Sequence, residues 1–229
     1  MNATPRLDLY AGIHKALRAL MADLLTAVGR MDPTDDADVR ATFERLDEGL
    51  ALCEKHLQHE DRFVHPAIEA RRPGATARAA LEHAGHVEEF AGLRAAMDAF
   101  LAAGRSARLD SAHGLYLAFA RWMANNLLHM EHEETHHNRA LWDAFTDAEL
   151  LGILARIHAN IPPQESGLVL RWMLPSSNHP ERVAQLAGMR ANAPREAYEA
   201  ALALARSRLA PRDWDKLHRA LETPAAMAA

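Results

Sequence analysis

HMEHEETHH, residues 129–137, is the stretch on which the predicted fold depends. Within it Glu133 follows His129 by four residues, and the same spacing occurs once earlier, where Glu60 follows His56. On an α-helix, residues four apart lie about 40° apart around the axis and one turn along it. Each His and Glu would therefore point from one helix face toward a common target.

An imidazole and a carboxylate that converge in this way form half of a ligand shell for a first-row transition metal such as iron, zinc or manganese. A single pair of this kind is more often a solvated polar face, because short motifs occur frequently by chance. Because the pair occurs twice, we favour a metal site over a solvated face: two such helices could supply both halves of one ligand shell.

Histidine is the unusual residue in the composition. The chain has 14 histidines in 229 residues, and 11 of them lie between His14 and His137, which indicates a site. Hydrophobic residues make up 49% and charged residues 25%, and alanine is abundant while β-branched residues are few. This balance favours helix throughout, so we expect an all-α protein.

Charge and cysteine usage exclude several classes of partner. The formal charge is -5 with acids and bases interspersed, which predicts neither a nucleic-acid partner nor a membrane-binding basic patch. No signal peptide is apparent, and no apolar run approaches the roughly 20 residues of a membrane span. The single cysteine, Cys53, cannot form an internal disulfide. We therefore expect a cytoplasmic protein.

Apolar residues recur at helical spacing in four long segments, at residues 7–28, 37–63, 76–104 and 110–145. Pro66 should kink or end the second helix near Arg62, because proline removes a backbone donor. Four long helices with short connections predict an up-down antiparallel four-helix bundle. We assign it to residues 1–146. Residues 147–229 lose the histidine cluster and predict a smaller helical region that caps the bundle or forms a homodimer.

The spacing of the histidines indicates an internal repeat. His56 to His129 and Glu60 to Glu133 are each steps of 73 residues, and His14 to His86 is a step of 72. The two halves of the bundle thus look like two copies of a helix pair. Burying carboxylates and imidazoles without a partner would cost several kcal/mol per ion, so these side chains either face water or bind metal.

Together these residues resemble the hemerythrin-like, or HHE cation-binding, family: His in the first helix, His-x-x-x-Glu in the second, His in the third and His-x-x-x-Glu in the fourth. The resemblance covers about residues 7–145. It implies a non-haem di-iron centre, with two iron ions bridged by carboxylates and an oxo or hydroxo group, in preference to zinc or manganese. The terminal ligands it implies are His14, His56, His86 and His129, and the bridges are Glu60 and Glu133.

His83 competes with His86 as the ligand from the third helix. Counting both gives five histidines and two carboxylates, as in the oxygen-carrying hemerythrins. Those carriers have His-x-x-x-His in the third helix and His-x-x-x-x-Asp in the fourth, whereas this chain has His83-Ala84-Gly85-His86 and a four-residue step to Glu133. The difference favours the intracellular members of the family, which are linked to sensing of oxygen, nitric oxide or iron and to iron-sulfur repair.

Three functions remain open at this point. The first is a module that binds or senses a diatomic ligand, O2 or NO, or the redox or iron state, at a di-iron centre. The second is an enzyme that activates oxygen or peroxide, although ferritin-like oxidases use Glu-x-x-His instead of His-x-x-x-Glu. The third is iron handling or a structural metal with a closed ligand shell.

The remaining polar residues near the motifs have less specific interpretations. We expect His59 and His132 at the surface or hydrogen-bonded behind the ligands. His65, His136 and His137 lie beyond the ligand turns, where we expect solvated side chains. The other residues considered are Tyr10 and Asn126, as packing residues or partners of ligands, and Cys53, as a small buried residue.

Overall fold

The computed structural model of the chain describes residues 6–222, and within that range every regular element is a helix. The all-α prediction is therefore confirmed. The expected starts and ends of the two domains, at residues 1 and 229, fall outside the described residues. None of the described helices is both long enough and apolar enough to cross a bilayer.

The described residues form two compact units. The first comprises residues 6–11 and 20–160, and the second comprises residues 12–19 and 161–222. The first unit runs past residue 146, where the sequence placed the boundary, because α7 (Asp147–His158) packs within it. Leu150 and Ile153 of α7 share a buried cluster with Val64, Ile68 and Leu141.

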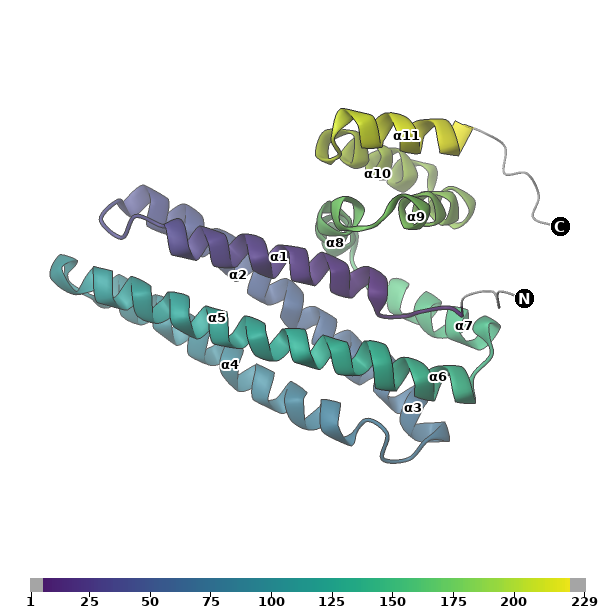
Figure 1. Cartoon of the computed structure of the whole chain (residues 1–229), viewed down its shortest axis with the longest axis horizontal. Helices are drawn as coiled ribbons and strands as arrows, with labels where there is room; N and C mark the ends of the chain where they lie inside the picture. Colours follow the sequence, from purple (N-terminus) through teal and green to yellow (C-terminus); the bar gives the residue numbers. More distant parts are fainter. Residues whose placement is uncertain (1–5, 223–229) are drawn as a thin grey trace. The chain divides into compact units, whose positions relative to one another are not determined.

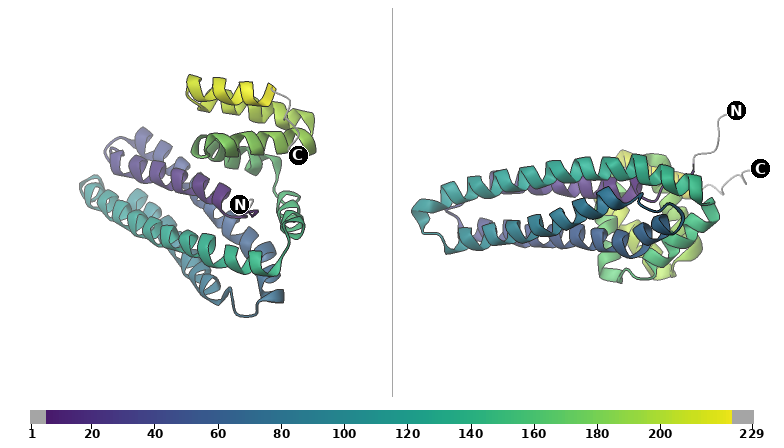
Figure 2. Two further views of the ribbon diagram at one scale, coloured as in Figure 1. Left: turned by 45° about the vertical axis from the view of Figure 1, so that its right-hand side comes forward. Right: turned by 90° about the horizontal axis from the view of Figure 1, so that it is seen from below.

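Four long helices account for most of the residues from 11 to 132: α1 (Ala11–Arg30), α2 (Asp36–His59), α4 (Ala77–Ala102) and α5 (Arg108–His132). A short 3-10 turn, η2 (Arg105–Ala107), leads from α4 to α5. Figure 1 shows α4 and α5 running along each other, and the views in Figure 2 agree. α2 lies against α4 as well.

Two glycines allow close approach of the last part of α1 to its neighbours. A Cβ at Gly49 of α2 would collide with the side chain of Leu24, and a Cβ at Gly29 would lie 3.0 Å from the ring of Tyr116 on α5. Apolar side chains fill the space between the helices, and the largest that are fully buried include Phe90, Phe100, Phe119 and Trp122. The rings of Phe90 and Phe119 lie 5.6 and 5.0 Å from Trp122.

Local sequence sets where the helices begin. The Asp35 carboxylate accepts hydrogen bonds from the backbone N–H groups of Ala37 and Asp38, which caps α2. Thr146 and Glu149 form a reciprocal capping box at the start of α7. Gly74 supplies the positive φ, 85°, that the turn before α4 requires.

The two His-Glu helices do not continue as simple α-helices. At Glu60 the hydrogen bonding of α2 changes to the wider i to i+5 register over η1 (Glu60–Val64), and at Glu133 that of α5 changes in the same way over η3 (Glu133–His137). Each π-segment leads directly into a short helix, α3 (His65–Arg71) or α6 (Asn138–Ala144).

A proline follows only the first of these two π-segments. The α-helical register of α2 ends at His59, and Pro66 falls in the first turn of α3, where its missing donor does little harm. The chain therefore continues as helix past Arg62, where the sequence predicted a kink or an end. The second π-segment and α6 contain no proline, so the shared feature is the glutamate with which each π-segment begins.

The structure reproduces the repeat seen in the sequence. α2 ends at residue 59 and α5 at 132, the π-segments begin at 60 and 133, and the short helices span 65–71 and 138–144. Every one of these bounds is offset by 73 residues, the step that separates Glu60 from Glu133. The two halves of the first unit therefore bring equivalent glutamates to equivalent places.

The second unit contains α8 (Pro163–Ser176), α9 (His179–Asn192), α10 (Arg195–Arg208) and α11 (Pro211–Glu222). Its core is apolar, with Leu174, Leu186, Ala205 and Leu217 fully buried. Arg182 donates hydrogen bonds from its guanidinium to the carbonyls of Leu174 and Pro175, at 2.7 and 2.9 Å, and so caps the end of α8. The helical character expected for this region is confirmed.

Candidate metal centre

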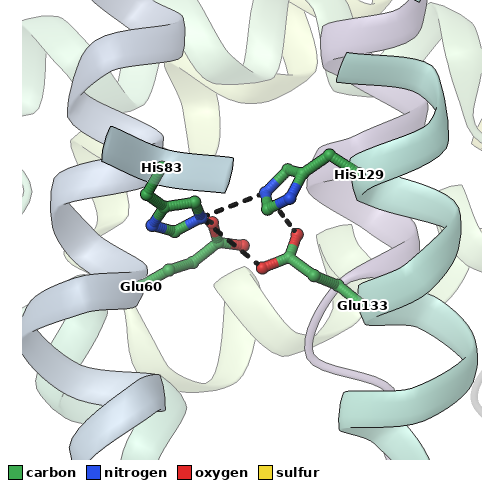
Figure 3. Close-up of side chains that lie close together, drawn as sticks. All are labelled: Glu60, His83, His129 and Glu133. Carbon is green, nitrogen blue, oxygen red and sulfur yellow. Dashed lines mark hydrogen bonds and ion pairs between the residues drawn. The ribbon is translucent and has the colours of Figure 1, made fainter. Parts of the chain in front are cut away.

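Four side chains converge where the two π-segments begin: Glu60 from η1, His83 from α4, His129 from α5 and Glu133 from η3 (Figure 3). Each offers one ligand atom, and these atoms lie within 4.8 Å of one another. All four side chains are buried, with exposed fractions between 0% for Glu133 and 5% for His129. Glu60, His129 and Glu133 come from the two His-Glu pairs of the sequence, and the fourth member, His83, comes from α4 in place of His56.

The distances suit ligands of one ion. His83 Nε2 lies 3.0 Å from His129 Nε2, and His129 Nε2 lies 3.2 Å from Glu133 Oε2. First-row metals bind imidazole nitrogen and carboxylate oxygen at about 2.1 Å, so two ligands at a right angle lie about 3.0 Å apart. His83 Nε2 is also 3.7 Å from Glu60 Oε2 and 3.8 Å from Glu133 Oε1. One ion could therefore contact all four residues after small movements.

A second group contains the other residues expected from the first two helices. Ligand atoms of His14, His56 and Glu60 lie within 4.8 Å of one another. His56 Nε2 is 3.0 Å from Glu60 Oε1, and the His14 side chain is fully buried. Glu60 belongs to both groups, as a bridging carboxylate would.

Carboxylates lie behind three of the histidines and fix their orientation. Nδ1 of His83 pairs with Asp61 at 2.7 Å, Nδ1 of His129 with Glu82 at 2.9 Å, and Nδ1 of His86 with Glu89 at 2.9 Å. A carboxylate that accepts the Nδ1 proton leaves the Nε2 lone pair available, the arrangement found behind metal-binding histidines. Only Glu89 lies on the same helix as its histidine, so spacing along the sequence did not indicate the other two partners.

Two of these outer carboxylates are themselves held in place. Arg78 contacts Glu82 at 2.8 Å, and Asn125 donates to Glu89 at 2.6 Å. The chain of contacts from Arg78 through Glu82 to His129 therefore extends from the surface to the centre. Such support limits the movement of the imidazole and favours one ligand geometry.

The structure separates His83 from His86, which the sequence left as competitors. His83 lies in the central group, whereas His86 lies in none of the groups that bring three ligand atoms within 4.8 Å among the described residues. His86 is nevertheless buried, its ring centroid is 5.0 Å from that of His129, and its Nε2 has no hydrogen-bond partner among residues 6–222. Asn126, expected as a partner of a ligand, approaches Nδ1 of His86 at 3.4 Å.

His65 and His137 were expected in solvent, and that prediction is wrong. Both are buried, and their ligand atoms lie within 4.8 Å of each other and of Glu133. For His65 the reason is the π-register: five residues turn an α-helix through about 140° beyond a full turn, but an i to i+5 register places residue 65 above residue 60. His137 follows Glu133 by four residues, so α-helical periodicity alone already places it on the face of Glu133. His136 is exposed as expected, and His132 is buried and His59 half-buried.

The charges around the centre keep the Glu133 carboxylate ionised, which favours cation binding. Burial and the neighbouring Glu60 raise the pKa of Glu133, but the His65 and His83 imidazoles, 3.7 and 3.8 Å from its carboxylate, outweigh them and lower it to about 2. Burial lowers the pKa of His83, but Glu133, Glu60 and Asp61 together raise it to about 9. Without a metal, a proton on His83 therefore compensates the buried carboxylates, and metal binding would displace that proton.

Other ionisable groups nearby are kept neutral by burial. Desolvation lowers the pKa of His129, lowers that of His137 to about 4, and raises that of Tyr10 well above its usual value. The Tyr10 hydroxyl lies 3.1 Å from His137 Nδ1. Burial also raises the pKa of the Cys53 thiol to about 12, which agrees with its expected role as a small packing residue and disfavours thiolate ligation.

Comparison of the chain with protein-family models, with curated proteins and with solved structures found no match in any of the three. The observations that bear on function are therefore those of the site itself: buried His and Glu groups that could hold metal ions, and a repeat that brings them together.

Proposed function

We propose that this chain is a hemerythrin-like protein whose helices α1, α2, α4 and α5 form an up-down antiparallel bundle around a non-haem di-iron centre, and that it binds or senses a diatomic ligand there. The observation that carries the proposal is the convergence of Glu60 and Glu133, from equivalent positions of a repeat, on buried histidines whose outer nitrogens face carboxylates.

The ligands divide into two sets that share Glu60. His83 and His129 would hold one ion together with Glu60 and Glu133, and His14 and His56 would hold the other with Glu60. Imidazole and carboxylate donors suit iron, zinc and manganese better than calcium or magnesium, which prefer oxygen alone. Two ions sharing carboxylates match the chemistry of di-iron centres in helical bundles, so iron is our choice.

Burial supports a small ligand. The side chains of His14, Glu60, His83, His129 and Glu133 are each exposed by 5% or less. Bound iron would supply redox-active positions with affinity for O2 or NO, and the protein residues orient the ligands and keep bulk water away. This enclosure favours binding of a diatomic molecule over turnover of a large organic substrate.

Metal analysis with optical spectroscopy tests the proposal. Protein loaded with iron(II) under anaerobic conditions and then exposed to air should contain at least two iron ions per chain and show near-ultraviolet bands that shift when azide or nitric oxide is added. Recovery of a single colourless zinc ion, or of no bound metal, would overturn the di-iron proposal.

Ligand variants make the test specific. Glu60→Ala and His129→Ala should each lose metal and lose most of the thermal stabilisation that metal gives, which is about 2.7 kcal/mol when free metal is at 100 times Kd. His113→Ala, on the exposed face of α5, is the matched control and should keep both ions. Equal metal content in all three variants would contradict the assignment.

A further inference from the structure

We propose that His65, His137 and Glu133 form a third cation position, which takes a divalent first-row transition metal beside the two-metal centre. The inference goes beyond the proposed function, but it rests on that proposal in one respect, because Glu133 is shared. The two histidines are not part of the ligand pattern that the sequence indicated.

The geometry around Glu133 carries the proposal. His65 Nε2 lies 3.7 Å from Glu133 Oε1, and His137 Nδ1 lies 3.8 Å from the same oxygen. The rings of His65 and His137 are perpendicular, with centroids 5.2 Å apart. Two imidazoles therefore approach one carboxylate oxygen from different directions, as ligands around one ion do.

His65 is prepared to act as a ligand. Its Nδ1 lies 3.1 Å from Asp61 Oδ1, the carboxylate oxygen that also pairs with His83. Its side chain is 8% exposed, and its Nε2 is buried with no hydrogen-bond partner within residues 6–222. A buried imidazole nitrogen with this arrangement is unfavourable unless a proton donor or a cation occupies the space in front of it.

His137 faces Glu133 with its Nδ1 nitrogen, whereas His65 does so with Nε2. His137 is fully buried, its Nε2 likewise has no hydrogen-bond partner among the described residues, and its Nδ1 is 3.1 Å from the Tyr10 hydroxyl. The hydroxyl of Tyr10 lies close enough to support the ligand or to contribute a further oxygen.

His65 and His137 would bind an ion other than the one held by His83 and His129. Ligand atoms of one ion lie at most about 4.2 Å apart, twice the metal-ligand distance of about 2.1 Å. Among the described residues, no group combines His65 or His137 with more than one member of the central set of four: His65 groups with Asp61 and His83, and both histidines group with Glu133. We therefore assign them to a position of their own instead of to the ion held by His83 and His129.

The first π-segment explains how His65 reaches the position. Residue 65 follows η1, so the wide turn brings it back toward the glutamate that begins that segment, whereas residue 137 ends η3 and lies four residues after the glutamate that begins it. The repeat equivalents of His65 and His137 are Asn138 and Val64, which are also buried. The third position is therefore built from non-equivalent residues and should be occupied once per chain.

Counting bound cobalt(II) tests the inference. Metal-free protein, titrated with cobalt(II) well above the dissociation constants and freed of excess metal, should hold three ions per chain. His65→Gln and His137→Gln should each hold two, with the visible absorption of the remaining ions preserved. His136→Gln, an exposed histidine in the same π-segment as His137, is the control and should hold three.

Three results would overturn the third position: wild-type protein that saturates at two ions, variants that keep three, or variants that fall below two because the histidines serve the central pair. The first of these is independent of the variants, so it decides the matter even if one of them unfolds. Saturation at two also leaves the di-iron proposal standing, whereas saturation at none refutes both.

Discussion

At the scale of single residues, Asp61 organises more of the site than its exposed position suggests. It is the residue after Glu60, and one of its oxygens pairs with Nδ1 of both His83 and His65. Asp61 thus couples a ligand of the central group to a ligand of the third position. Removing a carboxylate from behind a metal-bound histidine generally lowers metal affinity 10- to 100-fold.

We therefore expect Asp61→Asn to weaken metal binding by roughly 10- to 100-fold, because an amide accepts the Nδ1 protons less strongly. Competition with a chelator of known affinity measures the change. Asp98→Asn, at an exposed position of α4, should bind as wild type does. Indistinguishable affinities for the two variants would show that Asp61 does not position the histidines.

At the scale of elements, the sequence predicted what depends on α-helical periodicity and missed what depends on the π-register. The His-x-x-x-Glu pairs were found because four residues make about one α-turn, and Glu60, His83, His129 and Glu133 lie together. His65 was missed because, five residues after Glu60, it lies on a different α-helical face. No signal in one sequence indicates that both helices widen at their glutamates.

Replacing glycine by alanine should lower the free energy of unfolding at a closely packed position and raise it at an open one. Gly49→Ala should destabilise the protein by about 1–3 kcal/mol, because the added methyl group collides with buried Leu24. Gly92→Ala, on an open face of α4, should instead stabilise it by roughly 0.5–1 kcal/mol through helix propensity. Chemical denaturation of both variants measures this, and equal signs would contradict the packing described.

The contact between α3 and α7 gives a pH-dependent prediction. The side chain of Arg71, together with Thr146, lowers the pKa of Glu149 to about 2, so the ionised carboxylate favours the folded state. That contribution is complete above the unfolded pKa, about 4.5, and is lost as the pH falls toward 2.

Glu149→Gln should accordingly be less stable than wild type at pH 7, and the difference should shrink as the pH falls from about 4.5 toward 2. Thermal unfolding at several pH values measures it, with exposed Glu48→Gln as the control. A difference that stays constant over this range would mean that the charge of Glu149 does not stabilise α7.

At the scale of the whole molecule, composition and the spacing of apolar residues were enough to predict an all-helical chain with a histidine-rich part and a second helical part. The boundary was harder to predict. The histidine cluster ends near residue 146, but apolar residues of α7 extend the first unit to Asn160, because burial and not ligand chemistry sets where a unit ends. The homodimer expected through the C-terminal helices stays a prediction.

The central claim is that Glu60 and Glu133 hold two iron ions between them, and X-ray absorption at the iron edge of the loaded protein tests it most directly. The account predicts nitrogen and oxygen neighbours at about 2.1 Å, outer scattering from imidazole rings, and a second iron within about 4 Å. Iron with oxygen neighbours alone and no second iron would contradict it.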